Sequence, residues 1–534
     1  MQLGVKLDSR GSAFLKNPIT TIEVNPPSLH LPRPVQAALL DSPMAGLRDI
    51  EDLDQEVRIK AELQVPQPAH WEPATGSIPG TSRIYLKTFG CSHNISDSEV
   101  MLGLLTEAGY KPVAEPSEAD VWIVNSCTVK NPSQDAFETW VKRAKEAHKP
   151  LVVAGCVPQA DKALYWLDDV SVVGVTQIDR IVEVVEQTLT GNVVKMLSMR
   201  KLPSLMLPKV RRNRLVEIVT ISTGCLGRCT FCKTKQARGN LVSYPIAEIV
   251  RRVQDACAEG VKDIWLTSED SGAYGRDIGT NLPALLREVL KVLPRDVMLR
   301  VGMTNPPYVL EHIQALAKIL LHPQVYEFIH IPVQSGSNAV LTAMQREYGI
   351  EEFWKLVDQL RALVPRVHIC TDIICGFPGE TDEHHQETLS LLRKYQFPSV
   401  YISQFYPRPG TPAASMTRVP TQVVKQRSRE VTELFGSYKS FDYLLGTTQQ
   451  VFLRDEEDEK EKEGMVGHTK DYTKVVLPRV EGAIGGSVYV RIVEAGKWHV
   501  VGEIVPAPKP VSSTYYLLVA VAVLLLALMW TSSS

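Results

Sequence analysis

The chain has 534 residues, which is too long for one hydrophobic core and predicts about three or four domains. Its 44% of hydrophobic and 22% of charged residues are typical of a folded globular protein. The net charge of −2 excludes bulk charge as a means of binding nucleic acid, so any such contact has to come from local basic patches.

Nine cysteines are present, and the first 20 residues carry scattered charges without the apolar run of a signal peptide. We therefore expect a reducing compartment, in which grouped cysteines indicate metal binding or catalysis and not disulfide bonds. Six of the nine form two groups of three. Cys257, Cys370 and Cys375 lie in apolar contexts and are expected to be buried as small hydrophobic residues.

Residues 1–80 contain many prolines and no sustained periodicity, so we expect a mostly disordered leader. Order is predicted to begin with a strand at Arg83 that ends in a Gly-Cys turn. A helix is expected from about Ser96 through Leu105, with Ser96 as its N-cap and Glu99 as the capping-box partner.

Between residues 83 and 190, three apolar strand segments each end in a cysteine, and helical segments alternate with them. This pattern predicts an open parallel α/β domain, in which the carboxyl ends of the strands line the ligand crevice. Cys91, Cys127 and Cys156 should converge there as an iron–sulfur site, although each alone could be an ordinary buried cysteine. His93 is expected to support this site and not to bind metal.

The segment from Ser222 to Gly239 contains Cys225, Cys229 and Cys232 in a C-x3-C-x2-C spacing. Three thiolates suit three irons of a 4Fe–4S cube better than a structural zinc ion, which takes four protein ligands. The fourth iron would stay open for a small molecule. A zinc knuckle with a distant fourth ligand, or a set of buried thiols, are the alternatives that the spacing alone leaves open.

From residue 215 to 438, strand and helix signals alternate six times. Repeated βα units predict a partial (β/α)6 barrel with its chemistry at the carboxyl ends of the strands. Polar and glycine-rich motifs follow strands two, four and five, and together they predict a small-molecule site above the cysteine cluster. These motifs are Ser268-Glu-Asp270, Gln334-Ser-Gly-Ser337 and Cys375-Gly-Phe-Pro-Gly-Glu380.

Residues 439–506 change to short alternating runs with glycine turns, which predict a small antiparallel β barrel. Basic side chains of this barrel could line an RNA face, or they could be ordinary surface charges. A further basic run closes the linker predicted at 191–214. The candidate RNA contacts are Lys209, Arg211, Arg212, His468, Lys470 and Lys474.

The stretch 514–531 is uncharged and mostly apolar. At about 1.5 Å per residue, its apolar part covers roughly 24 Å, close to the thickness of the hydrocarbon core of the endoplasmic reticulum membrane. Tyr515, Tyr516 and Trp530 lie where interfacial aromatic residues belong. We therefore expect a linker at 507–513 and a transmembrane tail anchor, with the other domains facing the cytosol.

Phe231 directly before Cys232 completes the signature C-x3-C-x-aromatic-C, and the chain resembles the radical S-adenosylmethionine (SAM) superfamily. The span 83–505 resembles the radical SAM methylthiotransferases, which carry an N-terminal domain with three cysteines, a radical SAM core and an RNA-binding TRAM barrel. Four strings resemble the archaeal and eukaryotic threonylcarbamoyladenosine tRNA methylthiotransferase branch, whose eukaryotic members carry a tail anchor. They are Thr88-Phe-Gly-Cys-Ser-His-Asn94, Cys127-Thr-Val-Lys130, Gly155-Cys-Val-Pro-Gln159 and Thr267-Ser-Glu-Asp-Ser-Gly-Ala-Tyr-Gly275.

The resemblance implies two 4Fe–4S clusters and SAM as cofactors. SAM on the cluster of Cys225, Cys229 and Cys232 would be cleaved reductively to a 5′-deoxyadenosyl radical. That radical would remove the hydrogen at C2 of an N6-threonylcarbamoyladenosine beside the tRNA anticodon. The other cluster would present a methylated sulfur, and a second SAM would donate the methyl group. An electron donor and a sulfur donor are implied as partners.

The resemblance also implies contacts to SAM. Residues 268–270 would approach its methionine end, Ser335 and Arg346 its polar groups, and the loop 376–380 its adenosine. One departure from the family pattern is Gly349, where serine or threonine is expected. The implied cofactor contacts are Phe231, Ser268, Glu269, Asp270, Ser335, Arg346, Gly376, Gly379 and Glu380.

Two alternatives stay within this enzyme class: methylthiolation of isopentenyladenosine in tRNA, or of an aspartate in a ribosomal protein. The string 267–275 and the predicted anchor favour threonylcarbamoyladenosine. An alternative of another class is a membrane-tethered iron–sulfur or zinc protein that binds RNA without catalysis. The intact cysteine triads and the strand-end motifs argue against it.

Overall fold

The computed structural model describes residues 80–128, 131–161, 164–454 and 464–508. The predicted leader and the predicted membrane anchor at 514–531 lie outside these ranges. Within them, no helix combines the length and the apolar character needed to span a bilayer. The elements described below, up to Ile504, belong to one compact unit.

The first sheet has six strands, all parallel, in the order β2-β1-β3-β4-β5-β6. This confirms the open parallel α/β arrangement; the two edge strands have two residues each and are too short to show a periodicity. The strands are β1 (Arg83–Thr88), β2 (Lys111–Pro112), β3 (Val121–Ser126), β4 (Leu151–Gly155), β5 (Ser171–Val173) and β6 (Lys195–Met196).

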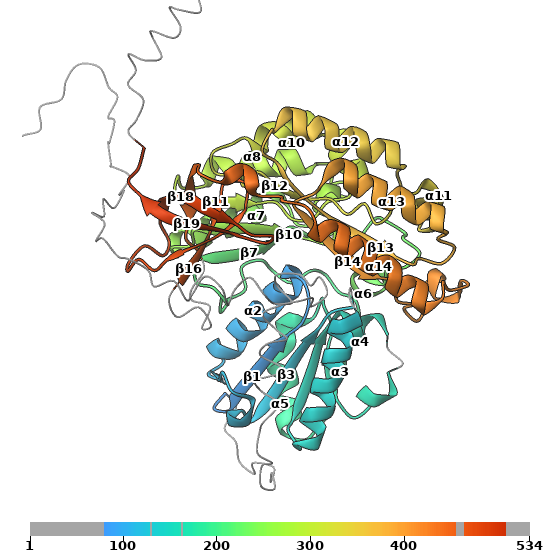
Figure 1. Ribbon diagram of the computed structural model, residues 1–534. Helices are drawn as coiled ribbons and strands as arrows, with labels where there is room; N and C mark the ends of the chain where they lie inside the picture. The colour runs from blue at the N-terminus through green and yellow to red at the C-terminus, as the bar shows by residue number, and fades with distance from the viewer. Residues whose placement is uncertain (1–79, 129–130, 162–163, 455–463, 509–534) are drawn as a thin grey trace, which may run out of the picture. The chain divides into compact units, whose positions relative to one another are not determined.

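Helices cover both faces of this sheet, as parallel sheets require (Figure 1). Apolar side chains of α2 (Ser92–Glu107) and α5 (Ile181–Leu189) pack with the strands in one core cluster. Those of α3 (Asn131–Glu146) pack with the strands in another, which includes Tyr85 and Trp122. Burial on both faces explains why the central strands read as continuous apolar runs.

Helix α2 begins at Ser92, four residues before the predicted start. Its N-cap is Cys91, which makes no side-chain capping bond, and Ser96 and Glu99 therefore lie inside the helix. Ser96 Oγ donates to the Ile218 carbonyl at 3.3 Å, and the Glu99 carboxylate accepts from the Arg212 amide at 3.1 Å. The predicted capping box is wrong because tertiary partners, and not the helix end, take up these side chains.

Six further parallel strands form the core, all within the predicted range 215–438. They make two three-stranded sheets, and a parallel bridge between Leu299 and Val325 links the two. The strands are β7 (Val216–Thr220), β10 (Asp263–Thr267), β11 (Met298–Arg300), β12 (Phe328–His330), β13 (His368–Cys375) and β14 (Ser399–Gln404).

Amphipathic helices connect these strands and cover them with apolar side chains in one large cluster. They include α7 (Ile246–Ala258), α8 (Leu282–Val292), α10 (Ile313–Leu320), α12 (Ile350–Leu363), α13 (Asp382–Tyr395) and α14 (Thr421–Gly436). Two short strands, β8 (Ser222–Thr223) and β9 (Val242–Ser243), pair antiparallel after β7.

The last sheet closes into a five-stranded barrel in the order β15-β16-β17-β19-β18. The prediction of a wholly antiparallel barrel is wrong for one pair, because β17 and β19 run parallel. Five strands cannot alternate in direction around a closed ring, so one neighbouring pair has to be parallel. The strands are β15 (Thr448–Phe452), β16 (Gly464–Thr469), β17 (Lys474–Pro478), β18 (Ser487–Ala495) and β19 (Val500–Val505).

This barrel packs against the amino ends of the core strands. Tyr472 of the barrel makes ring contacts with Tyr326 and with Phe328, the first residue of β12. Arg454 Nε lies 3.8 Å from the carboxylate of Asp263, the first residue of β10. The carboxyl ends of the same strands are therefore at the opposite end of the core from the barrel.

Candidate functional site

The central cysteine segment leaves the core at the carboxyl end of β7, and the β8–β9 pair closes it into a loop. Gly224 has a φ of +78°, and a Cβ there would lie 2.2 Å from the Asn240 carbonyl oxygen, so the turn requires glycine. The Cys225 amide donates to the Gly239 carbonyl at 3.2 Å. The loop is therefore held at both of its ends.

The three thiols of this loop lie beside cationic and polar groups. Arg346 donates from Nη1 to the Cys229 sulfur at 3.0 Å. The Thr234 hydroxyl lies 3.1 Å from Cys232 Sγ. Burial raises the pKa of Cys225 to about 12, so this thiol ionises at neutral pH only when a bound cation offsets its charge.

The loop also leaves room beside its sulfurs. A Cβ at Gly227 would lie 3.6 Å from Cys225 Sγ and 3.7 Å from Cys229 Sγ. In the described parts of the chain, no three His, Cys, Asp or Glu side chains are grouped so as to hold one metal ion. A 4Fe–4S cube does not need such convergence, because each cysteine binds a different iron. The donor set fits a cube with one open iron.

The structure brings the other three cysteines together at the carboxyl edge of the first sheet. Cys91 and Cys127 are joined by a hydrogen bond, which raises the pKa of Cys91. Burial raises the pKa of Cys156 to about 11, and Cys91 lies close enough to add to this effect. Gly90 has a φ of +101°, and a Cβ there would come within 2.6 Å of Cys127 Sγ. Three loops distant in sequence thus supply one group of thiols.

Asn94 holds these three loops in place. Its Nδ2 donates to the Phe89 carbonyl at 2.9 Å and to the Ser126 carbonyl at 2.8 Å. Its Oδ1 lies 3.7 Å from Cys156 Sγ. The side chain is fully buried. Asn94 therefore links the three loops that carry this triad. Its position three residues after Cys91 in the sequence does not reveal this role.

Asp270 and Ser268 follow β10 and are held in a network of short contacts. Asp270 Oδ2 accepts from Asn305 Nδ2 at 2.6 Å, and Asn305 Oδ1 accepts from Arg346. Ser268 Oγ accepts from the Asp270 amide at 3.1 Å. Burial raises the pKa of Asp270 to about 6 despite its bonds to Asn305. This network reaches the Cys229 sulfur through Arg346.

Glu269 is directed toward the first sheet and not toward the cysteine loop of the core. Its Oε1 lies 2.8 Å from His93 Nδ1 and 3.4 Å from Arg238 Nε. His93 is buried at the start of α2. Both of these neighbours belong to the chain, and the role of Glu269 as a SAM contact stays a prediction.

The remaining predicted SAM contacts gather around the loop after β13. Gly376 has a φ of +74°, and its amide donates to Glu380 Oε2 at 2.8 Å. Glu380 is buried and pairs with Arg427 at 2.8 Å, so its charge is used within the fold. The Phe231 ring packs edge-on against Phe377, with centroids 6.3 Å apart. The aromatic residue of the cysteine motif thus contacts this loop.

Ser335 lies after β12 and is also buried. Its Oγ accepts from the Ser337 amide at 3.2 Å and lies 3.4 Å from the Thr388 hydroxyl. Gly379 has a φ of +84° and an open space where a Cβ would lie. These two residues shape the turns after β12 and β13.

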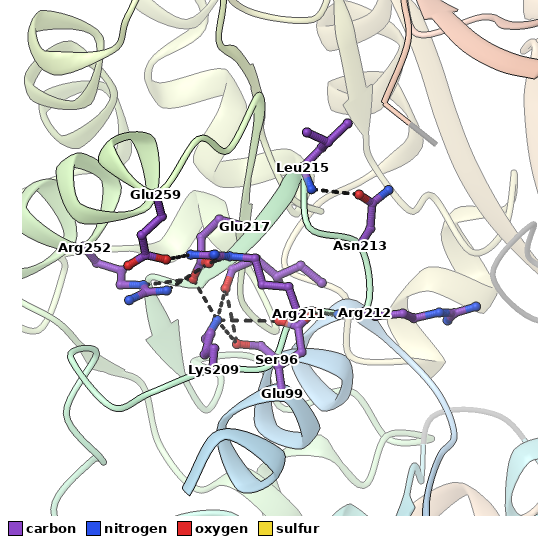
Figure 2. A network of polar contacts seen from close by, with 11 residues as sticks. Ser96, Glu99, Lys209, Arg211, Arg212, Asn213, Leu215, Glu217, Arg252 and Glu259 are labelled. Atoms are coloured by element: carbon purple, nitrogen blue, oxygen red, sulfur yellow. Dashed lines mark hydrogen bonds and ion pairs between the residues drawn. The ribbon is translucent and has the colours of Figure 1, made fainter. Parts of the chain in front are cut away.

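Two of the predicted RNA contacts lie in an ion-pair network around the buried Glu217 (Figure 2). Lys209 Nζ lies 3.0 Å from Glu217 Oε1, and its side chain is 6% exposed. Arg211 Nε lies 2.5 Å from Glu217 Oε2. The charges of Lys209 and Arg211 are balanced within the chain, and their contacts with RNA stay a prediction. Arg212 points away from the network (Figure 2).

The barrel residues divide in the same way. His468 stacks on Tyr472 with centroids 4.4 Å apart, and burial lowers its pKa to about 3. Lys470 donates from Nζ to the carbonyls of Leu320, at 3.1 Å, and Val325. Lys470 therefore joins the barrel to the core, and the RNA contacts of both residues stay a prediction. Lys474 is half-buried on β17.

Two family descriptions match the chain. "Radical SAM superfamily" matches residues 219–392, and "Uncharacterized protein family UPF0004" matches residues 83–173. The range 219–392 contains the core strands β10 to β13 and the triad Cys225, Cys229 and Cys232. The range 83–173 contains the triad Cys91, Cys127 and Cys156.

The chain is 52% identical over 438 residues to the threonylcarbamoyladenosine tRNA methylthiotransferase of Homo sapiens, covering 81% of this chain and 75% of the relative. It is 37% identical to the probable threonylcarbamoyladenosine tRNA methylthiotransferase of Pyrococcus abyssi, covering 79% of this chain and 99% of the relative. A solved structure of the radical SAM methyltransferase TsrM from Kitasatospora setae covers 62% of this chain and 75% of its own at 14% identity, with a TM-score of 0.46. On its identity to the curated relatives, the chain belongs to the threonylcarbamoyladenosine tRNA methylthiotransferase family.

Proposed function

We propose that this enzyme replaces the hydrogen at C2 of N6-threonylcarbamoyladenosine, at position 37 of tRNA, with a methylthio group. The observation that carries the proposal is the pair of separate cysteine triads in a chain of this family. With two sets of thiols, the removal of hydrogen and the supply of sulfur can take place at separate sites.

The two triads are the proposed cluster ligands. Cys225, Cys229 and Cys232 would hold the cluster that binds SAM, and the sheet-edge triad (Cys91, Cys127 and Cys156) the second cluster. When bound, the clusters and SAM supply the radical and sulfur chemistry that replacing an aromatic C–H requires. Arg346 keeps a positive charge within 3.0 Å of Cys229 Sγ, which favours the thiolate form of that ligand.

The proposed SAM contacts surround the same loop. Asp270 and Ser335 offer buried polar groups, and Ser268 a half-buried one, at the ends of β10 and β12. Phe231, with Gly376 and Gly379 of the loop after β13, would form an apolar and backbone-lined wall for adenosine. Pockets for small cofactors commonly combine such walls with a few polar groups.

We infer further that the closed five-stranded barrel at 439–506 is a TRAM domain that binds tRNA. Arg212 is exposed in the linker and Lys474 is half-buried on β17, and both are candidates for phosphate contacts. Replacing both with glutamine is expected to weaken tRNA binding and to reduce its salt dependence, because fewer counterions are released. Equal tRNA affinity and salt slope in wild type and variant would contradict this assignment.

The apolar stretch 514–531 is proposed as a tail anchor in the endoplasmic reticulum membrane, with the folded part in the cytosol. A fluorescent protein fused to residues 507–534 is expected to sediment with microsomes and to resist alkaline extraction. The matched control replaces Leu525 and Leu526 with arginine, which costs about 2.5–3.5 kcal/mol per residue at a membrane centre. Extraction of the wild-type fusion by alkali would rule out an anchor.

The central test combines metal analysis with product identification. After anaerobic reconstitution we expect about eight irons per chain, and one electron paramagnetic resonance signal that changes on addition of SAM. Mass spectrometry of nucleosides from tRNA containing threonylcarbamoyladenosine should then show the methylthio product. Product on isopentenyladenosine alone, or zinc in place of iron, would refute the proposal.

A further inference from the structure

A run of polar contacts, interrupted only by the peptide link from Glu269 to Asp270, connects the two cysteine triads. It begins at Cys156, whose sulfur accepts from Arg238 Nε at 3.4 Å. Arg238 Nε is also 3.4 Å from Glu269, and the next residue in the chain, Asp270, begins the path through Asn305 and Arg346. That path ends at Cys229 Sγ, 3.0 Å from Arg346 Nη1.

Arg238 is the point where this path crosses from the core to the first sheet. It lies at the end of α6 (Thr234–Arg238), which packs on α4 (Cys156–Ala160) through Ala237 and Cys156. Its Nη2 donates to Asp97 at 2.7 Å and to Asn94 at 2.8 Å, both on α2. The arginine thus contacts a ligand of one triad while its helix follows directly after the other triad.

Burial makes this arrangement demanding. Arg238 is 3% exposed, and its charge is balanced by Asp97 and Glu269. A buried guanidinium needs such partners, because desolvation without them is costly. Its fork of donors holds several acceptors at fixed angles, which a lysine cannot do. Glu269 in turn contacts His93, two residues after Cys91. The pair therefore touches the start of α2 at two places.

We infer that Arg238, held by Glu269, is a positioning residue. It fixes the position of the sheet-edge triad relative to the SAM-binding triad. The inference rests on the proposed function. Its consequence is that SAM cleavage is coupled to sulfur transfer only while the contact between Arg238 and Cys156 is intact. The residue acts through Cys156 and not on the substrate.

The first readout is the ratio of 5′-deoxyadenosine to methylthio product. Arg238→Gln and Glu269→Gln are expected to keep about eight irons and to cleave SAM, but to raise this ratio roughly ten-fold, because the sulfur is misplaced. Arg238→Lys keeps the charge without the fork and should fall between. Arg276→Gln, in an exposed ion pair with Glu311, is the matched control.

The second readout does not depend on turnover. In a chain with Cys225, Cys229 and Cys232 replaced by alanine, only the sheet-edge cluster remains. Its reduction potential should fall on Arg238→Gln, since hydrogen bonds and positive charge near cluster sulfurs raise it. If Arg238→Gln does not fold, Glu269→Gln is measured instead; it removes a negative charge near the same cluster, so the potential should then rise.

The outcomes are separable. A wild type that makes no methylthio product would refute the proposed function, and the potential would still test the contact of Arg238 with Cys156. A productive wild type, with ratio and potential unchanged in both glutamine variants, would overturn the inference. A lower melting temperature with an unchanged ratio would likewise reduce Arg238 to a structural residue.

Discussion

At the scale of single residues, the two triads make different demands, and a matched pair of variants separates them. Cys229→Ala is expected to abolish SAM cleavage, because it removes a ligand of the proposed SAM-binding cluster. Cys156→Ala should spare cleavage and stop sulfur insertion. Cys257→Ala, half-buried and outside both triads, is the control. Both reactions are followed by chromatography of deoxyadenosine and of tRNA nucleosides. Persistent cleavage in Cys229→Ala would contradict the assignment.

Asn94 offers a test that leaves every cysteine in place. Asn94→Ala removes the donors to the Phe89 and Ser126 carbonyls, and leaving buried polar groups unpaired costs about 1–3 kcal/mol each. We expect the sheet-edge triad to lose its metal, so that iron content falls from about eight to about four per chain. Iron analysis and thermal unfolding measure both effects. Asn192→Ala, at an exposed site, should change neither.

The residue scale also shows what sequence can and cannot reveal. Cysteine spacing and strand-end position predicted two thiol groups that the structure brings together. The partners of Glu269 and Lys209 were not predictable, because a charged residue carries no mark of whether its partner lies inside the chain. Arg238 and Asn94 were missed for the same reason: their role exists only once distant loops meet.

At the scale of elements, the network around Glu217 joins β7 to α2 and α7 (Figure 2). Burial alone would raise the pKa of Glu217, but Lys209, Arg252 and Arg211 lower it to about 2. A carboxylate with a lowered pKa adds stability at pH values above about 4.5, and this stability is lost only as the pH falls toward 2.

Glu217→Gln is therefore expected to destabilise the fold strongly. It leaves the three cations around this buried side chain short of a counter-charge, and breaking a buried pair costs about 3–5 kcal/mol. Urea denaturation monitored by circular dichroism measures the loss. Glu288→Gln, in an exposed pair with Lys291, should stay within about 0.5 kcal/mol. Similar midpoints for the two variants would show that this network does not stabilise the joint.

Helices and strands were predictable where the hydrophobic periodicity extends over many residues. The prediction failed where tertiary contacts decide which side chains form a helix end. The six core strands were predicted in number and within the range 215–438, because apolar runs and amphipathic helices alternate in the sequence. The start of α2 was misplaced, since Ser96 and Glu99 look like a cap but bond to β7 and the linker. The parallel pair in the barrel follows from strand number and could not be seen in any one strand.

At the scale of the whole molecule, the contact between barrel and core contains two neutral histidines. Burial lowers the pKa of His368 to about 4 and that of His468 to about 3. The unfolded chain takes up protons near pH 6.5, whereas the folded chain does not until the pH is much lower. The part of the free energy of unfolding that depends on these two neutral histidines is fully present above about pH 6.5. It is lost progressively as the pH falls toward 4.

We therefore expect the melting temperature to fall between pH 7.5 and pH 5, and the fall to be smaller in His368→Gln. Glutamine keeps a donor for the Ser399 hydroxyl, which His368 Nε2 contacts at 2.8 Å, but it cannot titrate. Calorimetry at several pH values gives the comparison. An identical pH dependence in wild type and variant would exclude His368 as a source of the acid sensitivity.

The packing of the barrel on the amino ends of the core strands has a consequence for the size of any bound molecule. Strand β13 has eight residues, which span about 26 Å at roughly 3.3 Å per residue. A ligand that touches both the barrel and the cysteine loops has to reach past the length of this strand. A free nucleoside is far too small for that, whereas a folded stem-loop is long enough. The length of the core thus sets a minimum size for a substrate. Only a macromolecule is long enough to contact the barrel and the cysteine loops at the same time.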